Sequence, residues 1–318
     1  MGRRHDGIQP AAQKPTTQKP TTQNPEIRSE ADLLDVDTKQ ATSPIPHTYM
    51  NILDQIIADT RDLIAQRKKE TPLSDLEQRP AYDDREPLSL VEAMKKRGMS
   101  FIAEVKKASP SKGVIREDFR PAQIAQQYAA NDAHAISVLT EPLHFQGSLE
   151  NLAWIRAHVP DVPLLRKDFI VDPYQLAEAR AYGADAVLLI ATALDRHQLY
   201  DLHQAADELG LSCLVEVYSL DDLEKIDFDQ VSLLGVNNRD LKAFDVDIEN
   251  SLRIFQHVPR SVGRISESGL SDPETLVHLR QNGINGVLIG EYFMRADNPG
   301  DALSDLRNRA KEIAQQRV

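Results

Sequence analysis

The stretch AVLLIATALDRHQLYDLHQAADELGLSCLVEV, residues 186–217, contains the pattern that decides the fold. Its two ends, residues 186–190 and 213–217, are short apolar runs of the kind that form buried parallel strands. Between them, residues 196–209 have the length and amphipathic spacing of a surface helix. The same alternation recurs over residues 101–289, so we predict an α/β fold built from one repeated unit.

Eight apolar runs are predicted as strands, over residues 101–105, 135–139, 163–165, 186–190, 213–217, 231–236, 263–266 and 286–289. Helices are predicted between them, for example over 121–130, 173–182, 196–209 and 273–281, and two extra helices precede them, over about 50–69 and 89–96. Eight strand–helix units are typical of a (β/α)8 TIM barrel. A doubly wound open sheet is the alternative, but no G-x-G-x-x-G motif follows the first strand.

The N-terminal segment differs in composition from the rest of the chain. Residues 1–46 contain QKPTTQ repeats and scattered Ala, Gln and Thr. Such a segment buries too little apolar surface to offset the loss of chain entropy on folding. We therefore predict a disordered tail over residues 1–46 and one barrel domain over residues 47–318.

Whole-chain composition restricts the class of protein. The net charge of −12 argues against nucleic-acid or anionic-membrane partners. The chain has no run of eighteen apolar residues and no apolar segment behind its basic start, which argues against a membrane span or a secretory signal. Its single cysteine, Cys213, suits a reducing, cytoplasmic environment. No long apolar seam stands out, so we expect a monomer or a weak oligomer.

Charged residues interrupt the apolar strands at inward-facing positions. Glu104 and Lys106 share one face of the first strand, and Lys167 continues the inward phase of the third. A structural ion pair and a catalytic pair are both open readings of Glu104 and Lys106. Burial and a nearby Lys106 are expected to lower the pKa of Lys167, with Glu104 opposing that shift. Glu216 is isolated in the fifth strand and needs a lysine partner, Lys167 or Lys106.

Other residues of the same strands have the opposite phase. Arg166 and Asp168 flank Lys167, and we read them as structural. Cys213 is out of phase with Glu216, so we expect it to pack against a helix as a small apolar side chain.

Polar residues and glycines follow the last three strands. Asn237 and Arg239, after the sixth, suit either loop caps or a carboxylate site. Gly269 and Gly290 stand just beyond the seventh and eighth strands. Glycines at these two places let backbone N–H groups approach a phosphate, which is a recurrent site in such barrels.

Taken together, the motifs AEVKKASPSKG, SVLTE with HFQGS, LLRKDFIVDPYQ, LVEV, GVNNRDL, ISESGL and VLIGEYFMR resemble the indole-3-glycerol phosphate synthase family. The likeness runs from about Ile52 to the C-terminus. It implies a decarboxylating, dehydrating ring closure of 1-(2-carboxyphenylamino)-1-deoxyribulose 5-phosphate, a small phosphorylated substrate, without metal or organic cofactor. The catalytic residues of the family fall on Glu104, Lys106, Lys167, Glu216, Asn237 and Ser268.

The resemblance also implies the substrate contacts, which fall on Ser109, Phe145, Leu188, Leu189, Arg239, Glu267, Gly269, Gly290 and Glu291. Lys167 would be the general acid, and Leu188 or Leu189 would border the aromatic ring. The loop over residues 107–118 is a candidate mobile cover.

Two other readings compete with this one. A phosphoribosylanthranilate isomerase would be expected to use a cysteine and an aspartate, yet the one cysteine faces away from the barrel interior. A non-catalytic phosphate-binding barrel subunit would have no task for the buried charges, which are costly to retain.

Overall fold

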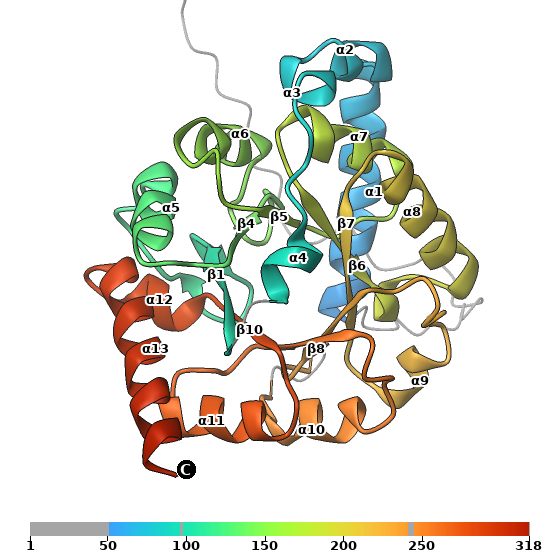
Figure 1. Cartoon of the computed structure of the whole chain (residues 1–318). Coiled ribbons are helices and arrows are strands. Elements are labelled where there is room, and N and C mark those ends of the chain that lie inside the picture. Colours follow the sequence, from blue (N-terminus) through green and yellow to red (C-terminus); the bar gives the residue numbers. More distant parts are fainter. Residues whose placement is uncertain (1–50, 96–97, 241–244, 318) are drawn as a thin grey trace, which may run out of the picture. The chain divides into compact units, whose positions relative to one another are not determined.

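The computed structural model describes residues 51–95, 98–240 and 245–317. The predicted tail, residues 1–46, lies outside these ranges. Within them, eight parallel strands close into a barrel in the order β1-β10-β9-β8-β7-β6-β5-β4, as predicted (Figure 1). The strands are β1 (Ser100–Val105), β4 (Ala135–Leu139), β5 (Leu164–Lys167), β6 (Ala186–Ile190), β7 (Ser212–Val217), β8 (Leu233–Asn237), β9 (Gly263–Glu267) and β10 (Gly286–Ile289).

Three strands extend farther toward their C-terminal ends than the apolar runs predict. β5 includes Lys167, β8 includes Asn237 and β9 includes Glu267. An apolar run stops at the first polar residue, whereas the ladder continues, with Asn237 paired to Glu267. Polar side chains are thereby held on regular strands, which fix their direction better than loops do.

Helices surround the strands and lead into them (Figure 1). Those of the repeated units are α5 (Pro121–Ala130), α6 (Leu149–His158), α7 (Pro173–Ala181), η1 (Ala191–Ala193), α8 (Arg196–Glu208), α9 (Leu220–Leu223), α10 (Glu249–Phe255), α11 (Pro273–Gln281), α12 (Glu291–Arg295) and α13 (Pro299–Gln316). Before the barrel come α1 (Ile52–Glu70), α2 (Leu73–Glu77), α3 (Pro80–Asp83) and α4 (Leu90–Met94). Local sequence sets several starts: Asp172 and Asp195 make capping boxes for α7 and α8.

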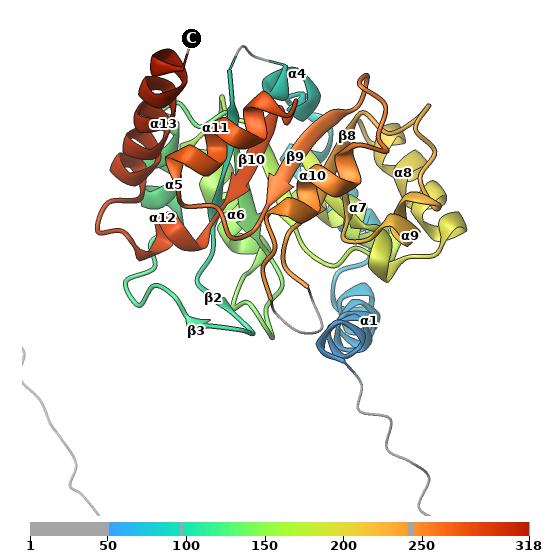
Figure 2. The same ribbon diagram turned by 90° about the horizontal axis from the view of Figure 1, so that it is seen from below.

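The two ends of the barrel carry different additions. Figure 2 shows α1 and a hairpin of β2 (Ala108–Ser109) and β3 (Gly113–Val114) at one end, and α4 at the other. Because β1 runs directly into β2, the end with α1 and the hairpin is the C-terminal end of the strands. Barrel enzymes place their chemistry at this end.

Strand alternation divides the apolar side chains into two layers. Ile102, Leu165 and Leu214 pack inside the barrel, within one apolar cluster. Leu189 and Cys213 belong to the larger cluster between strands and helices. The prediction for Cys213 is therefore confirmed, and Leu189 faces the helices.

Arg166 has the structural role that its phase predicts, whereas Asp168 pairs with it and also lines a pocket at the C-terminal end of the barrel. Arg166 is fully buried, and its guanidinium lies 2.8 Å from Asp168 and 3.1 Å from Glu178 of α7. It also donates to the carbonyl oxygen of Gln175 at 2.6 Å. Burial lowers the pKa of Arg166, but the two carboxylates raise it by more. Arg166 thus fastens α7 to β5.

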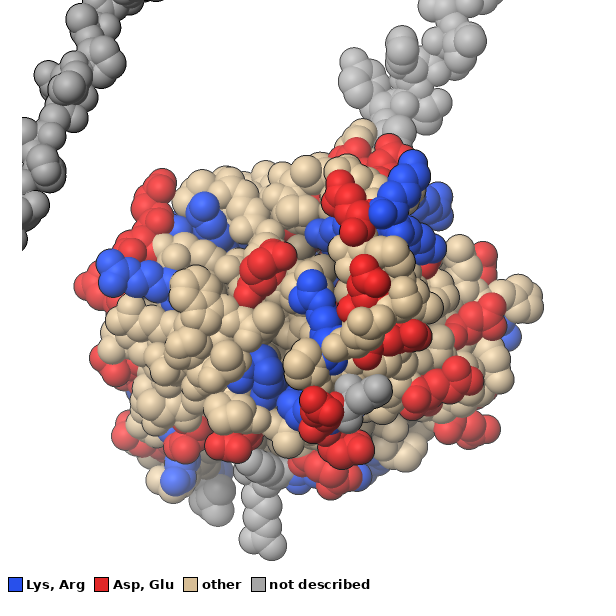
Figure 3. Space-filling view, turned by 90° about the horizontal axis from the view of Figure 1, so that it is seen from above, with Lys and Arg blue, Asp and Glu red and all other residues tan. Residues whose placement is uncertain are grey.

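The surface is mixed in charge despite the acidic total. On the face shown in Figure 3, Lys and Arg side chains lie in small groups among Asp and Glu side chains. Neither sign forms one continuous patch on that face. In the described part of the chain, no helix combines the length and apolar character needed to cross a bilayer.

Candidate active site

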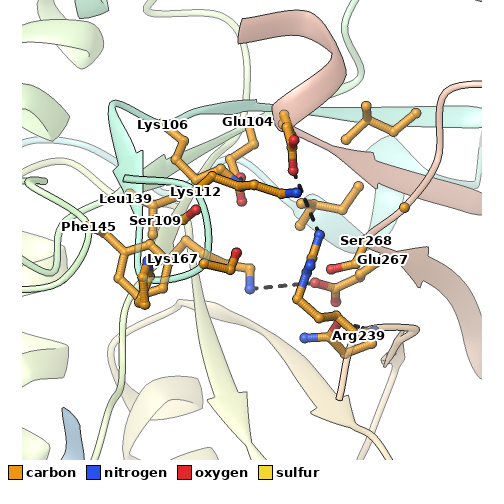
Figure 4. A pocket seen from close by; sticks show the side chains of 18 of the residues that line it. Glu104, Lys106, Ser109, Lys112, Leu139, Phe145, Lys167, Arg239, Glu267 and Ser268 are labelled. Atoms are coloured by element: carbon orange, nitrogen blue, oxygen red, sulfur yellow. Dashed lines mark hydrogen bonds and ion pairs between the residues drawn. The ribbon is translucent and has the colours of Figure 1, made fainter. Parts of the chain in front are cut away.

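A pocket of about 600 Å³ opens at the C-terminal end of the barrel. Residues of the strand ends, the hairpin, α1 and the start of α12 line it (Figure 4). Among the described residues, all the predicted site residues except Leu189 line this pocket. Side chains that are more than 60 positions apart in the sequence, such as Lys106 and Lys167, thus share one cavity.

Four ionisable side chains form the polar floor of the pocket. Glu104, Lys167, Glu216 and Glu267 come from β1, β5, β7 and β9, which are alternate strands of the barrel. Side chains of alternate strands share a layer in this fold. The Lys167 ammonium lies 3.0 Å from a Glu216 oxygen and 3.5 Å from a Glu267 oxygen. A single ammonium is therefore surrounded by carboxyl groups.

Two glycines leave room for the carboxyl groups of this floor. A Cβ at Gly235 of β8 would lie 2.1 Å from Glu267 Oε1. A Cβ at Gly290 would lie 2.1 Å from Glu104 Oε1. Both distances are far below ordinary contact, so any larger residue would displace a carboxyl group. Gly290, predicted as a phosphate contact, thus also seats Glu104.

The electrostatics of Lys167 differ from the prediction. Burial lowers the pKa of its ammonium, but Glu216, Glu267 and Glu104 together raise it by more, so the net shift is upward. The expected downward shift is wrong because the sequence does not reveal how many carboxylates converge on Lys167. A raised pKa keeps Lys167 in its protonated form.

The pKa of Glu267 is also raised, but for a carboxyl group this favours the uncharged form. Burial raises the pKa of its carboxyl group, Lys167 lowers it, and the neighbouring Glu216 and Glu104 raise it further. The net shift is well above the usual value, which favours the protonated form of Glu267. Glu267 Oε1 is buried and has no hydrogen-bond partner among the described residues.

Neighbouring polar groups set the orientation of the floor. Lys106 Nζ lies 2.6 Å from Glu104 Oε1 at the end of β1. Asn237 Nδ2 donates to Glu216 Oε1 at 3.3 Å, and Asn237 Oδ1 accepts from the backbone N–H of Arg239 at 3.0 Å. Glu216 is thereby held between Lys167 and Asn237, so one of its predicted lysine partners, Lys167, is confirmed.

The rim beyond β9 and β10 exposes backbone to the pocket. Ser268 and Gly269 both have positive φ, 69° and 76°, which brings their chain close to the cavity. Gly290 and Glu291, which follow the neighbouring strand β10, also line the pocket. The Glu291 carboxylate lies 3.0 Å from Arg295 and 3.7 Å from Arg239. This rim has the small residues and open backbone that an anionic group requires.

An apolar wall also lines the pocket. It is formed by Leu139, Phe145, Leu188, Ile190 and Leu288, together with Ile52, Leu53 and Ile56 of α1. The Glu141 carboxylate fixes the turn that presents Phe145, because it accepts backbone N–H bonds from residues 143, 144 and 145 at 2.7–2.9 Å. A flat aromatic ring fits against such a surface.

The choice between two leucines is settled by this wall. Leu188 points into the pocket, and Leu189 points toward the helices. Leu189 is therefore wrong as a substrate contact, since neighbouring residues on a strand face opposite sides. Sequence reasoning also missed Ile190 and the residues of α1. Once Leu188 is known to face the pocket, alternation along the strand places Ile190 on the same side.

The arrangement suits acid–base chemistry on an aromatic, anionic molecule. Ammonium donors and carboxyl acceptors lie within hydrogen-bond reach of each other, beside an apolar wall and an open-backbone rim. In the described ranges, no group of three or more His, Cys, Asp or Glu is arranged to hold a metal ion.

Comparison with known sequences identifies close relatives. The sequence profile described as indole-3-glycerol phosphate synthase matches residues 53–306. A protein of that name from Salinibacter ruber is 72% identical over 269 residues, 85% of this chain and 100% of its own length. Another, from Campylobacter jejuni, is 46% identical over 257 residues, 80% of this chain and 99% of its own length.

Solved structures of low identity resemble the fold. Tryptophan synthase subunit alpha from Legionella pneumophila has a TM-score of 0.52 at 12% identity, covering 70% of this chain and 97% of its own. The 3-hexulose-6-phosphate synthase from Salmonella typhimurium has 0.54 at 15%, covering 69% and 100%. These likenesses concern the barrel alone. The profile match and the two relatives carry the assignment: the chain belongs to the indole-3-glycerol phosphate synthase family.

Proposed function

We propose that this pocket catalyses indole-3-glycerol phosphate synthesis, a step of tryptophan biosynthesis, with Lys167 as its general acid. The substrate, 1-(2-carboxyphenylamino)-1-deoxyribulose 5-phosphate, loses carbon dioxide and water as the indole ring closes. The observation that carries the assignment of Lys167 is its ammonium group, held 3.0 Å from Glu216 in the pocket floor.

Ring closure begins when the ring carbon bearing the carboxylate attacks the ketone carbon. A new carbon–carbon bond forms, and the electron pair of the C=O bond moves to oxygen. Lys167 donates a proton to that oxygen, which becomes a hydroxyl. Its raised pKa is no obstacle, since the developing alkoxide is a stronger base than an amine. The bond to the carboxylate then breaks, carbon dioxide leaves, and its electron pair restores the aromatic ring.

Dehydration completes the indole. The nitrogen lone pair expels the new hydroxyl, and Lys106 protonates it so that it leaves as water. Glu216 then takes the proton from the adjacent ring carbon, and the electrons of that bond form the indole double bond. Two protons are donated and one is recovered, so one proton is taken up from solvent, which matches the loss of a carboxylate as neutral carbon dioxide. Direct contact lets Glu216 return its proton to Lys167.

Anchoring at both ends brings the two carbons together. The phosphate is assigned to the backbone at Ser268, Gly269, Gly290 and Glu291, with help from Lys106. Ser109, Asn237 and Arg239 are assigned to the carboxylate and hydroxyls, and Phe145 and Leu188 to the aromatic ring. Because binding fixes both ends of a flexible substrate, much of the entropy cost of ring closure is met before the chemical step. Glu104 Oε1 lies 2.6 Å from Lys106 Nζ and holds it in place, which supports an electrostatic role for Glu104.

Replacing Lys167 tests the proposal. Substrate is added to purified protein without added metal, and indole fluorescence is followed. Lys167→Ala is expected to lower kcat roughly 100- to 10,000-fold, the usual contribution of a positioned acid. Lys107→Ala is the matched control, because this substitution removes the same charge from a residue that does not line the pocket. Retained activity in Lys167→Ala, with an unchanged circular dichroism spectrum, would remove Lys167 from this role.

We further propose that the chain acts in the cytoplasm as a monomer or a weak oligomer. Its cysteine is a free, buried thiol. Among the described residues, exposed large apolar side chains such as Leu73, Trp154 and Tyr200 lie on separate helices. Analytical ultracentrifugation checks the oligomeric part: a dimer that persists at nanomolar concentration would contradict it.

A further inference from the structure

The basic side chains of the pocket are not equally available to a ligand. The lysines and arginines among the described lining residues are Lys106, Lys112, Lys167, Arg239 and Arg295. Four of them lie within ion-pair distance of a carboxylate of the site. Lys112 is the exception, because its ammonium makes no ion pair or hydrogen bond within the part of the chain that the structure describes. Lys112 is therefore the cation that remains to neutralise an anion.

The proposed phosphate seat needs such a cation. The rim formed by Ser268, Gly269, Gly290 and Glu291 supplies backbone groups but also brings in the Glu291 carboxylate. Arg239 and Arg295 face that carboxylate and offset its charge. Lys106 also helps to hold the phosphate, but it is paired with Glu104 at 2.6 Å, so a phosphate of about two negative charges near neutral pH still lacks a full counter-charge.

Lys112 reaches over this part of the pocket. It lies in the turn of the β2–β3 hairpin, where its backbone N–H donates to the carbonyl oxygen of Ser109 at 3.2 Å. Figure 4 shows its side chain crossing the pocket, with the amino group directed toward Arg239. The residue is exposed, so its ammonium can move a short distance without breaking other contacts.

The base of the hairpin is tied to the segment that follows α12. The Arg116 guanidinium donates to the carbonyl oxygens of Met294 at 3.1 Å, Ala296 at 2.8 Å and Asp297 at 3.1 Å. Since α12 begins at Glu291, one arginine connects the hairpin to the element that carries the rim. This connection places Lys112 on the phosphate side of the pocket.

We propose that Lys112 is a substrate-anchoring residue whose ammonium binds the phosphate group from the hairpin side. The proposal rests on the proposed function, which supplies the phosphorylated substrate. The phosphate is unchanged by the reaction, so Lys112 stabilises substrate, transition state and product alike. Such uniform binding affects KM and product affinity and leaves kcat nearly unchanged.

Binding of the product, indole-3-glycerol phosphate, tests the proposal by isothermal titration. Product has the phosphate but no carboxylate. Lys112→Ala is expected to weaken product binding and to raise KM by a similar factor, on the order of 10-fold at low salt for a solvent-exposed charged contact. Lys107→Ala, the control in the same hairpin, is expected to change neither. Lys112→Arg should restore most of the affinity, because it keeps the charge.

Three results would overturn the proposal. The first is unchanged product affinity in Lys112→Ala. The second is a raised KM with unchanged product affinity, which would assign Lys112 to the substrate carboxylate. The third is an equal loss of affinity in Lys107→Ala, which would reveal a general charge effect. Failure of the proposed function looks different, since the parent protein itself would then not convert the substrate to indole-3-glycerol phosphate, whatever the Lys112 variants did.

The tie through Arg116 gives an independent check. If Arg116 acts by positioning Lys112, Arg116→Ala weakens product binding in the parent protein but not in the Lys112→Ala background. Equal losses in both backgrounds would contradict a positioning role. Melting temperatures of all variants show whether the barrel itself has been affected.

Discussion

The substitution Gly235→Ala gives a sharp test of how the pocket floor is packed. Gly235 lies inside the barrel on β8, next to Glu267. An added Cβ would lie 2.1 Å from Glu267 Oε1, 3.2 Å from its Cδ and 3.5 Å from Leu214 Cδ1. Ordinary contact begins near 3.4 Å, so the carboxyl oxygen must withdraw by more than 1 Å. Leu214 is already at contact distance, and the methyl group therefore presses mainly on Glu267.

Two effects of measurable size are expected. Overpacking in a closed interior costs about 1–3 kcal/mol of unfolding free energy. Displacing Glu267 also disturbs the Lys167 ammonium, 3.5 Å away, and a shift of about 1 Å near the reacting atoms can lower kcat by roughly 100-fold. Urea unfolding measures the first effect, and indole fluorescence under saturating substrate measures the second.

A second background isolates the cause. Aspartate at position 267 is one methylene shorter, so its carboxyl group leaves space for the new methyl. Gly235→Ala should therefore cost less stability in Glu267→Asp than in the parent, by about 1 kcal/mol or more. An equal cost in both backgrounds, or a single variant with parental stability and kcat, would refute the packing argument.

Three further predictions concern single side chains. In the folded protein, burial and the neighbouring carboxylates raise the pKa of Glu267 above its usual 4.5, although Lys167 lowers it. The folded protein therefore keeps a proton that the unfolded chain releases. As a result, the stability of the parent protein falls as pH rises above that value. Glu267→Gln cannot lose stability in this way, because glutamine does not titrate. In urea unfolding from pH 5 to 8, the difference in unfolding free energy between variant and parent should shift in favour of the variant by up to about 1.4 kcal/mol per pH unit. A constant difference would contradict the protonated state of Glu267. Leu189→Ala should cost about 2–5 kcal/mol with an unchanged KM, while Leu188→Ala should also raise KM, and the reverse pattern would show that their facing is misassigned. Burial raises the pKa of the Cys213 thiol, so thiol reagents should label it in denaturant but not in the native protein, and rapid native labelling would speak against its packing.

Most of the fold and of the candidate site was predictable from the chain alone. Apolar runs separated by amphipathic helices predict eight strand–helix units because strands and helices expose side chains with different periods. Those periods also place Glu104, Lys167 and Glu216 on inward faces. Since strand C-terminal ends meet at one end of a parallel barrel, these distant residues were expected to converge.

Other properties depend on neighbours that no sequence pattern names. Alternation separates Leu188 from Leu189, but only the closed barrel decides which of the two faces the pocket. The pKa of Lys167 shifts upward because three carboxylates from three strands surround it, a balance set by distances rather than by spacing.

The sequence by itself therefore determined the repeated units, the closed parallel barrel and the strand ends that carry the chemistry, because these follow from periodicity and chain order. Tertiary structure decided the charge state of the floor, the glycine spaces that admit its carboxyl groups and the reach of Lys112 across the pocket. Those properties are sums of through-space contacts between segments far apart in the chain, and such contacts exist only once the barrel has closed.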